Sequence, residues 1–364
     1  MDTPHPKVTV LMPVYNGERY LRQSIESILN QTFKDFEFLI VDDASQDSSR
    51  DIIRSYADGR IRLIENADNL GLVKTLNRGL LLAEAEYIAR QDQDDISHPT
   101  RLEKQAAFLN DHPEIVLLGT RVNNIDGNGR SCKSYGYYIV TSELAIRWQV
   151  MFDNPFVHST VMMRSQIVRQ MGGYDDHFGY CEDYDLFSRL AQSYKATNLK
   201  EILCDYRFHP DSMTPHATKE NNLLMGAIMQ RTIKNYIRVD PPEEWIDFWL
   251  SVNNPNNFNS TVNTKKLIRT IESFHRKFIS IYPDAKRDAD IKEYISRMLI
   301  RISYNTTFKD RWGSFYCFCR VFMRDIPLAF NFLPKYLIAF FLGRHRNFVS
   351  KRFRTYCNLM GIKS

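Results

Sequence analysis

Hydrophobic and polar positions alternate between two periods over the first 120 residues. Short runs of consecutive apolar residues predict buried strands, and apolar residues spaced three or four apart predict helices. Strands that alternate with helices imply a mostly parallel central sheet with right-handed crossovers, flanked by helices. The predicted strands cover residues 8–12, 36–41, 61–64 and 86–89, and the predicted helices cover residues 20–30, 48–56, 72–83 and 99–110.

The pattern is less regular after residue 120. The run Asp126-Gly127-Asn128-Gly129 predicts a hairpin tip, because these residues favour tight turns. Further strands are expected at residues 157–163 and 202–208, and a helix at residues 182–191. Beyond about residue 218 the pattern is helical. We therefore expect an α/β domain of Rossmann-like architecture over residues 1–217 and a helical C-terminal region over residues 218–364.

Composition is ordinary for a globular protein, but charge is unevenly distributed. The 364 residues are 43% hydrophobic and 25% charged, with a formal net charge of +5. Residues 301–364 hold twelve Lys or Arg and two acidic residues, a net charge of +10, which leaves −5 for residues 1–300. Aromatic residues are interleaved with the basic ones between residues 315 and 354. This tail favours contact with an anionic membrane surface. A dimer or core contact is the main alternative, and nucleic acid is the least favoured partner.

Nothing in the sequence indicates secretion or a membrane span. The first residues are polar, without a basic segment followed by an apolar one. The most apolar run, residues 326–343, is interrupted by Pro327 and Pro334. Six scattered cysteines show no paired spacing for zinc. We expect a cytoplasmic protein, with peripheral contact to the inner face of the cytoplasmic membrane as the role of the tail.

The candidate chemistry centres on the run Arg90-Gln91-Asp92-Gln93-Asp94-Asp95. Three carboxylates within four residues repel one another, so a fold that gathers them at a strand end favours a bound cation. Carboxylate oxygens suit Mg²⁺ or Mn²⁺, and such an ion can bridge to a phosphate. A solvated acidic turn is the alternative reading of this segment alone.

Other polar residues follow the ends of predicted strands, where parallel sheets bind ligands. Tyr15 comes just after the first strand and can stack on a flat base, although a plain loop aromatic is the default. Asp43 follows the second strand and can accept a hydrogen bond from a base or ribose, whereas Asp47 suits a helix cap. No glycine-rich dinucleotide fingerprint or Gly-Lys-Ser/Thr phosphate loop is present.

The remaining candidates lie later in the chain. Glu182 and Asp183 open a predicted helix, and a helix N-terminus favours the ionised carboxylate that a proton acceptor needs. Capping is the commoner explanation for such acids. His158 lies within a predicted strand and is expected to be structural. His209 follows the last predicted strand and is the better ligand candidate.

These segments, taken in order, resemble the family 2 glycosyltransferases, which have the GT-A fold. The resemblance covers about residues 7–210, and residues beyond 218 carry no motif of the family. The matching segments are Pro13-Val14-Tyr15-Asn16, Val41-Asp42-Asp43-Ala44-Ser45, Asn69-Leu70-Gly71-Leu72, Asp92-Gln93-Asp94-Asp95 with Pro99 and Arg101-Leu102, and Gly172-Gly173-Tyr174 through Glu182-Asp183-Tyr184-Asp185-Leu186.

The resemblance implies an inverting enzyme that takes a sugar from a nucleotide-sugar donor, most often a UDP-sugar. The acceptor would be a glycan or lipid-linked saccharide, as in bacterial surface polysaccharide synthesis. Mn²⁺ or Mg²⁺ would be held by Asp94, and His209 would complete the metal or diphosphate contact. Asp183 would be the catalytic base, and Glu182 its supporting partner. The implied nucleotide contacts are Pro13, Tyr15, Asp43, Asp92 and Gln93.

Two other classes of protein remain as alternatives. A nucleotidyltransferase also uses acidic metal ligands on an α/β sheet, but it calls for a glycine-rich, basic loop after the first strand, where this chain has Pro13-Val14-Tyr15-Asn16. An inactive sugar-nucleotide-binding protein is expected to lack a metal carboxylate or the base, and this chain has both. The sequence does not identify the sugar, the acceptor or the oligomeric state, and leaves Asp95 open between a second metal ligand and helix entry.

Overall fold

The computed structural model describes residues 5–132, 139–210, 219–253 and 264–306, together with 316–317 and 319–321. The chain forms two compact units, Met1–Tyr236 and Ile237–Ser364. The helix α8 (Lys219–Ile237) falls almost entirely in the first unit, whereas the boundary expected after residue 217 assigns it to the appendage. The expected contacts of the basic tail lie mostly outside the described residues.

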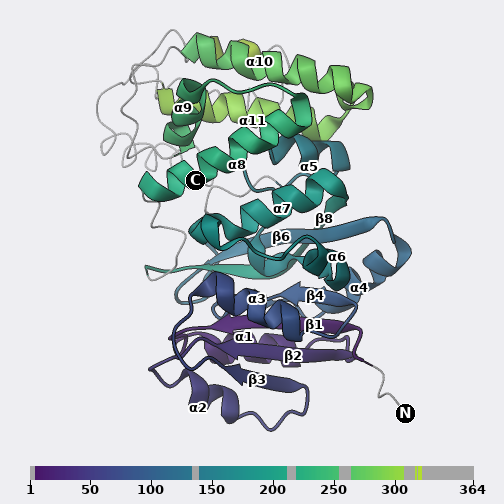
Figure 1. Ribbon diagram of the computed structural model, residues 1–364, viewed down its shortest axis with the longest axis vertical. Helices are drawn as coiled ribbons and strands as arrows, with labels where there is room; N and C mark the ends of the chain where they lie inside the picture. Colours follow the sequence, from purple (N-terminus) through teal and green to yellow (C-terminus); the bar gives the residue numbers. More distant parts are fainter. Residues whose placement is uncertain are drawn as a thin grey trace, which may run out of the picture. The chain divides into compact units, whose positions relative to one another are not determined.

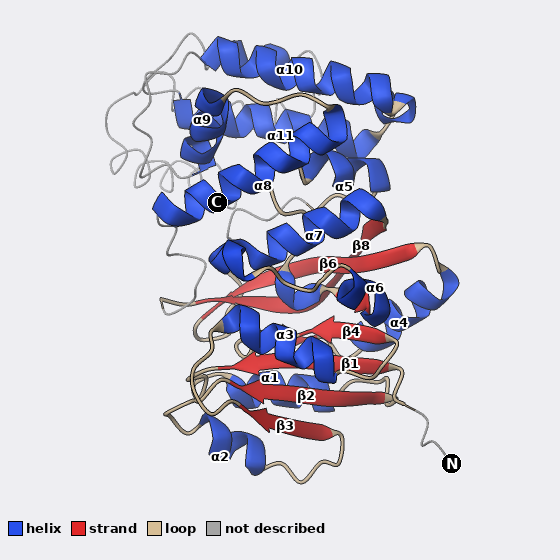
Figure 2. Cartoon of the chain, viewed as in Figure 1, coloured by secondary structure: helices blue, strands red, loops and turns tan. Residues whose placement is uncertain are grey.

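A single sheet organises the first unit (Figures 1 and 2). Within the described residues its strand order is β3-β2-β1-β4-β7-β6-β8-β5. The strands are β1 (Val8–Val14), β2 (Phe36–Asp42), β3 (Ile61–Glu65), β4 (Tyr87–Arg90), β5 (Ile96–Ser97), β6 (Ile115–Asp126), β7 (Met162–Arg164) and β8 (Lys195–Phe208).

Strand direction determines where the acidic motifs meet. Strands β1, β2, β3 and β4 pair in parallel, and so do β6 and β8. Strand β7 lies antiparallel between β4 and β6, and β5 pairs antiparallel with β8. Because parallel strands end at one edge, the loops after β1, β2 and β4 lie together. The predicted mostly parallel sheet is confirmed, with antiparallel pairings in its second half.

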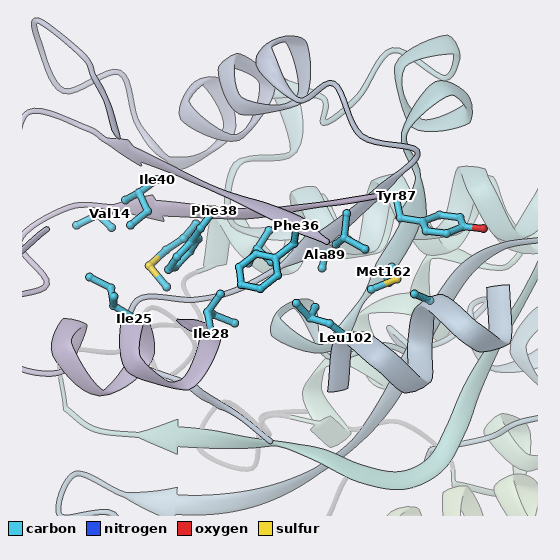
Figure 3. Packing of buried hydrophobic residues seen from close by; sticks show 14 of the residues in the cluster. Val14, Ile25, Ile28, Phe36, Phe38, Ile40, Tyr87, Ala89, Leu102 and Met162 are labelled. Carbon is cyan, nitrogen blue, oxygen red and sulfur yellow. The ribbon is translucent and has the colours of Figure 1, made fainter. Parts of the chain in front are cut away.

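Helices cover both faces of the sheet. Ile25 and Ile28 of α1 face Phe38 and neighbouring apolar side chains of the sheet, as Figure 3 shows. On the other face α3 packs so closely that a Cβ on Gly79 would lie 2.2 Å from Leu11 Cδ1. The helices of this unit before α8 are α1 (Leu21–Leu29), α2 (Ser49–Arg54), α3 (Leu72–Leu82), α4 (Arg101–Asp111), α5 (Glu143–Gln149), α6 (Ser165–Gln170) and α7 (Glu182–Ser193), with the short 3₁₀ helices η1 (His158–Thr160) and η2 (Asp176–Cys181).

The second unit is helical in its described part, as the sequence pattern predicts. It contains α9 (Glu243–Asn253), α10 (Thr264–Ile281), η4 (Pro283–Lys286) and α11 (Ala289–Thr306). The rings of Trp245 and Trp249 stack at 6.0 Å, and Phe274 of α10 meets Trp245 edge-on at 5.2 Å. Apolar residues of α10 at helical spacing are buried, which gives this unit its own core. No helix among the described residues has the length and apolar character that crossing a bilayer requires.

One predicted element is wrong, and several were not predicted. Residues 157–163 were expected to form a strand, but residues 158–160 form the 3₁₀ turn η1, and only β7 follows. The Thr160 hydroxyl and N–H both donate to the Val157 carbonyl, and this local bonding competes with a sheet ladder. Strands β5 and β6 and helices α5 and α6 have no counterpart among the predicted elements. The predicted turn is confirmed by the Gly129 N–H bond to the Asp126 carbonyl and the antiparallel bridge between Ile125 and Ser131.

Candidate functional site

The loop after β4 is held from below by buried polar side chains. Gln91 is buried, and its Nε2 donates to the carbonyls of Asp92 and Asp95. Its Oε1 accepts hydrogen bonds from Ser97 Oγ and from Arg101 Nη1 at 2.9 Å. These bonds hold the backbone of the loop at both ends. The acidic run therefore lies on a turn whose backbone is held by buried hydrogen bonds, and not on a freely solvated turn.

Asp94 lies beside His209, which follows β8. Asp94 Oδ2 is 2.9 Å from His209 Nε2. The His209 ring packs against Tyr20 at 4.8 Å, and the Arg207 guanidinium lies over the same tyrosine ring at 4.5 Å. Arg207 Nε also donates to the Asp94 carbonyl at 2.7 Å. Asp94 and His209 are 115 positions apart in the sequence, and contacts from β8 and from the start of α1 hold them together.

Asp92 has different partners from Asp94 and is paired with a buried cation. Arg90 Nη2 donates to Asp92 Oδ1 at 2.6 Å, and Ser159 Oγ donates to Asp92 Oδ2. Arg90 is buried, and its side chain is 1% exposed. Burial opposes ionisation of Asp92, yet the Arg90 guanidinium holds the pKa of this carboxyl below its usual value. Asp92 is therefore an ionised acceptor with a fixed orientation.

Asp95 is the most buried acid of the run. Its Oδ1 accepts a hydrogen bond from the Arg207 backbone N–H at 2.8 Å, which connects the loop to β8. Burial, with the nearby charges of Asp94 and Asp92, raises its pKa well above the usual value. The environment of Asp95 favours the protonated form.

Gln93 joins the loop after β4 to the loop after β1. Its Oε1 accepts from the Tyr15 N–H at 3.0 Å, and its Nε2 donates to the Tyr15 carbonyl at 3.1 Å. A Cβ on Gly17 would lie 2.5 Å from Gln93 Oε1, so a larger residue there would displace the Gln93 amide from its present position. The Tyr15 side chain is 44% exposed beside this junction, while Pro13 lies buried within β1.

Asp43 lies at the end of β2 and is occupied by the loop that precedes α3. Its Oδ1 accepts from Asn66 Nδ2 at 2.6 Å and from the Leu70 N–H at 2.9 Å, and its Oδ2 accepts from the Gly71 N–H at 2.9 Å. Asp43 is 3% exposed. These bonds position the edge of the 66–71 loop.

Glu182 and Asp183 form the second acidic centre at the start of α7. Asp183 Oδ2 accepts from Asn154 Nδ2 at 2.9 Å, and Asp183 Oδ1 accepts from the Tyr184 N–H at 2.7 Å. Burial raises the pKa of Asp183 to about 6. Burial and the neighbouring Asp183 charge raise the pKa of Glu182 to about 8. Burial outweighs the helix N-terminus that was expected to favour the ionised forms.

His158 and Tyr174 lie beside this centre. His158 Nε2 lies 2.8 Å from the Tyr174 hydroxyl, and its Nδ1 lies 3.9 Å from Glu182 Oε1. Burial, with the nearby Arg90 charge, lowers the pKa of His158 to about 3, so the ring is neutral. His158 is therefore a buried partner of Tyr174, in line with the structural role expected from the sequence.

The structure thus gathers the sequence-derived candidates into two groups. Asp92, Gln93 and Asp94 lie on one loop with His209 and Tyr15 in contact, whereas Glu182 and Asp183 form a separate centre. Sequence reasoning missed four residues that hold these acids by hydrogen bonds. Two of them had a signal in the sequence. Arg90 is a charged residue at the end of an apolar strand, and Asn154 begins an Asn-Pro turn. The four residues are Arg90, Asn154, Ser159 and Arg207.

The distance between the potential metal-ligand atoms of Asp94 and His209 is compatible with both binding one divalent cation. Two ligands in adjacent octahedral positions, each about 2.1 Å from a metal, are about 3 Å apart. Asp94 Oδ2 and His209 Nε2 are separated by 2.9 Å. Among the residues that the structure describes, no group of three His, Cys, Asp or Glu side chains could hold a metal. The separation is compatible with adjacent positions around one cation, and it is also the length of the hydrogen bond that the two side chains make.

Comparison with known proteins defines the class of this chain. The model of glycosyl transferase family 2 matches residues 9–172. The chain is similar to the putative glycosyltransferase EpsE of Bacillus subtilis, with 41% identity over an alignment of 215 residues that covers 57% of this chain and 74% of EpsE. It is also similar to the O-antigen biosynthesis glycosyltransferase WbnJ of Escherichia coli, with 30% identity over 63% of this chain and 92% of WbnJ.

The fold agrees with this class. A crystal structure of S. aureus TarS 1-349 in complex with UDP-GlcNAc superposes with a TM-score of 0.54 at 19% identity, covering 87% of this chain and 89% of TarS 1-349. The fold and the relatives together define a glycosyltransferase of GT-A architecture. The chain belongs to glycosyl transferase family 2, which confirms the resemblance seen in the sequence.

Proposed function

We propose that this protein is an inverting glycosyltransferase that moves a hexosyl or N-acetylhexosaminyl group from a UDP-sugar to a hydroxyl of a glycan or lipid-linked saccharide. The observation that carries the proposal is the presence of two separate acidic centres, Asp94 with His209 and Asp183 with Glu182. Transfer with inversion needs charge stabilisation at the leaving group and a proton acceptor elsewhere. The UDP-sugar is chosen because TarS, which shares the fold, was crystallised with UDP-GlcNAc.

The donor would bind over the loops after β1, β2 and β4. Tyr15 is exposed enough to stack on the base, and Asp43 and Pro13 would line the base and ribose region. Asp92, ionised and oriented by Arg90, would accept a ribose hydroxyl. Gln93 fixes the backbone on which Tyr15 stands. These roles make the edge of the sheet a nucleotide site.

Asp94 and His209 would hold Mn²⁺ or Mg²⁺ against the diphosphate. The bound ion would offset the negative charge that develops on the leaving nucleoside diphosphate. Asp94 supplies the charged ligand, and His209 supplies a ring nitrogen whose position is fixed by Tyr20. Arg207 donates a hydrogen bond to the Asp94 carbonyl, so the backbone that carries this metal ligand would stay in place when the nucleotide leaves.

Asp183 would accept the proton of the attacking hydroxyl. Its pKa of about 6 keeps it ionised at neutral pH and close to the range in which general bases work well. Glu182, with a pKa of about 8, would stay protonated beside it. The pair therefore carries one negative charge, which belongs on Asp183. Attack from the side of Asp183, with departure toward Asp94, would invert the anomeric carbon.

The experiment that tests this function is a panel of nucleotide sugars with release of nucleoside diphosphate as the signal, measured with and without Mn²⁺. A UDP-sugar is expected to give metal-dependent release that rises with a glycan acceptor. NMR of the product should show the anomeric configuration opposite to that of the donor. Retained configuration would contradict the assigned base, and release that ignores Mn²⁺ would contradict the role of Asp94 and His209.

The cellular setting is proposed on the same basis. The relative WbnJ acts in O-antigen biosynthesis, so a role in surface polysaccharide synthesis at the inner face of the cytoplasmic membrane fits the basic tail. Co-sedimentation with anionic vesicles should be strong for the full chain and weak for a chain ending near residue 300. Equal pelleting of the two would remove the membrane role of the tail.

A further inference from the structure

One short segment contacts both acidic centres. Residues 154–159 lie in the connection between α5 and β7 and include the first two residues of η1. Asn154, at one end, donates to Asp183 Oδ2 at 2.9 Å. Ser159, at the other end, donates to Asp92 Oδ2. The six residues from Asn154 to Ser159 therefore connect the carboxylate proposed as the base to the carboxylate proposed for the nucleotide.

The orientation of Asn154 is determined by its own surroundings. Its Oδ1 accepts from the Phe156 N–H at 3.1 Å. With the oxygen used in this way, the amide Nδ2 must face Asp183, and only a donor can stabilise a carboxylate. Asn154 therefore favours the ionised form of Asp183 and restrains the rotation of its carboxyl group.

The segment is itself tied down along its length. Asn198 Nδ2 donates to the Pro155 carbonyl at 3.1 Å, and His158 Nε2 lies 2.8 Å from the Tyr174 hydroxyl. Gln105 Nε2 donates to the Thr160 carbonyl at 2.8 Å. These anchors come from β8, from the residues before η2 and from α4. A segment held from three elements keeps a fixed length between its ends.

We propose that residues 154–159 form a positioning segment, which sets the separation and orientation of Asp183 relative to Asp92 through Asn154 and Ser159. The proposal rests on the proposed function, in which these two carboxylates serve the acceptor and the donor. Correct spacing matters because displacing a reacting group by about 1 Å can cost a hundredfold in rate. Asn154 and Ser159 act through the two acids and contact no reacting atom themselves.

The first test is Asn154→Asp, which removes the donor and adds a like charge beside Asp183. The charged or titratable groups that act on Asp183 are Glu182, Asp92, Arg90, Cys181 and Tyr174. None of them is altered by the substitution. The acid limb of kcat/KM is expected to move upward by about one pH unit, with the donor KM changed less than twofold. Asn235→Asp on α8, where the native amide donates to Gln192, is the matched control and should leave the limb in place.

The second test is Ser159→Ala, which frees one oxygen of Asp92. The donor KM, and the Kd for UDP measured by calorimetry, are expected to rise about fivefold to tenfold, the loss of one hydrogen bond. The acid limb of the pH profile should stay where it is. Ser165→Ala is the matched control, because the Ser165 hydroxyl is buried but has no hydrogen-bond partner among the described residues. Asn154→Asp is expected to move only the pH limb, and Ser159→Ala to raise only the donor KM. This division of effects distinguishes positioning from a general loss of stability, which would change both quantities in both variants.

A third measurement separates this proposal from the proposed function. Thermal unfolding of Asn154→Ala, Asp183→Asn and the double variant is compared with that of the unsubstituted protein. Non-additive shifts in Tm would show that the two residues are coupled even if no sugar is transferred. Absence of transfer in the unsubstituted protein would overturn the function alone. Additive Tm shifts, or a pH limb that Asn154→Asp does not move, would overturn the positioning role.

Discussion

Replacing Glu182 by glutamine is expected to stabilise the protein, and more so as pH rises. The side chain is buried, at 5% exposure, and lies beside Asp183 at the start of α7. Burial and the neighbouring carboxylate disfavour its charge, which raises its pKa from the ordinary 4.5 to about 8. Glutamine has nearly the same shape and carries no charge at any pH. The substitution therefore removes a group that the native protein must keep protonated.

The magnitude follows from proton linkage. Above pH 4.5 the unfolded chain has lost the Glu182 proton, while the native protein keeps it up to about pH 8. The native state binds more protons in this window, so this group makes the free energy of unfolding fall as pH rises. Each pH unit corresponds to about 1.4 kcal/mol, so the loss at pH 7 is on the order of 3 kcal/mol. Glu182→Gln should recover that amount at pH 7 and little at pH 4.5.

The assay is urea unfolding of both proteins at half-unit steps from pH 4.5 to pH 8.5. The difference in the free energy of unfolding should grow with pH and level off near pH 8. Glu220→Gln on α8 is a control, because that side chain is exposed and the difference should stay near zero. A constant difference at every pH, or a variant that becomes less stable relative to the unsubstituted protein as pH rises, would refute the conclusion that the native protein keeps Glu182 protonated at neutral pH.

Four further changes test other parts of the site. Asp94→Ala should abolish transfer and weaken UDP binding in Mn²⁺, and binding by calorimetry that is unchanged would remove Asp94 from the metal site. Asp183→Asn should abolish transfer with UDP affinity kept, and near-normal turnover would overturn its role as base. Arg207→Met should lower the Mn²⁺-dependent UDP affinity about 10- to 100-fold, as for support behind a metal ligand, and an equal loss without Mn²⁺ would contradict that route. Gly173→Ala should lower Tm, because φ is +65° and a Cβ would lie 2.6 Å from a side-chain oxygen of α3; Gly59→Ala, with open space around it, is the control, and equal Tm values would contradict the strain.

The fold was predictable where a strand is buried on both faces. Strands β1, β2 and β4 appear in the sequence as short, mostly apolar runs, because helices cover both sides of them. Strand β6 was missed since its second half, from Arg121, carries polar and half-exposed residues. Strand β5 has two residues and produces no periodicity at all. The sequence pattern therefore identified the first half of the sheet, and in the second half it identified only the last part of β8 and most of the residues of β7.

Of the candidate site, only the acidic residues could be predicted from the sequence. Carboxylates clustered at strand ends are visible in a sequence, but the residues that orient them are not. Asn154 lies 29 positions from Asp183, and Arg207 lies 113 positions from Asp94. The sequence around these positions does not reveal which acid each residue contacts, because the contacts join segments that are far apart in the chain. Asp43 shows the converse, since a visible acid proves to be largely engaged by the 66–71 loop.

The two acidic centres follow one electrostatic rule. In the first, Arg90 holds the pKa of Asp92 low, while burial raises that of Asp95 well above its usual value. In the second, Asp183 has a pKa of about 6 and Glu182 about 8. Near neutral pH each centre therefore holds an ionised acid, Asp92 or Asp183, beside an acid that favours its proton, Asp95 or Glu182, which limits repulsion in a buried site. The proton acceptor is then selected by its surroundings: Asn154 donates to Asp183, and Glu182 has no comparable donor among the hydrogen bonds described above.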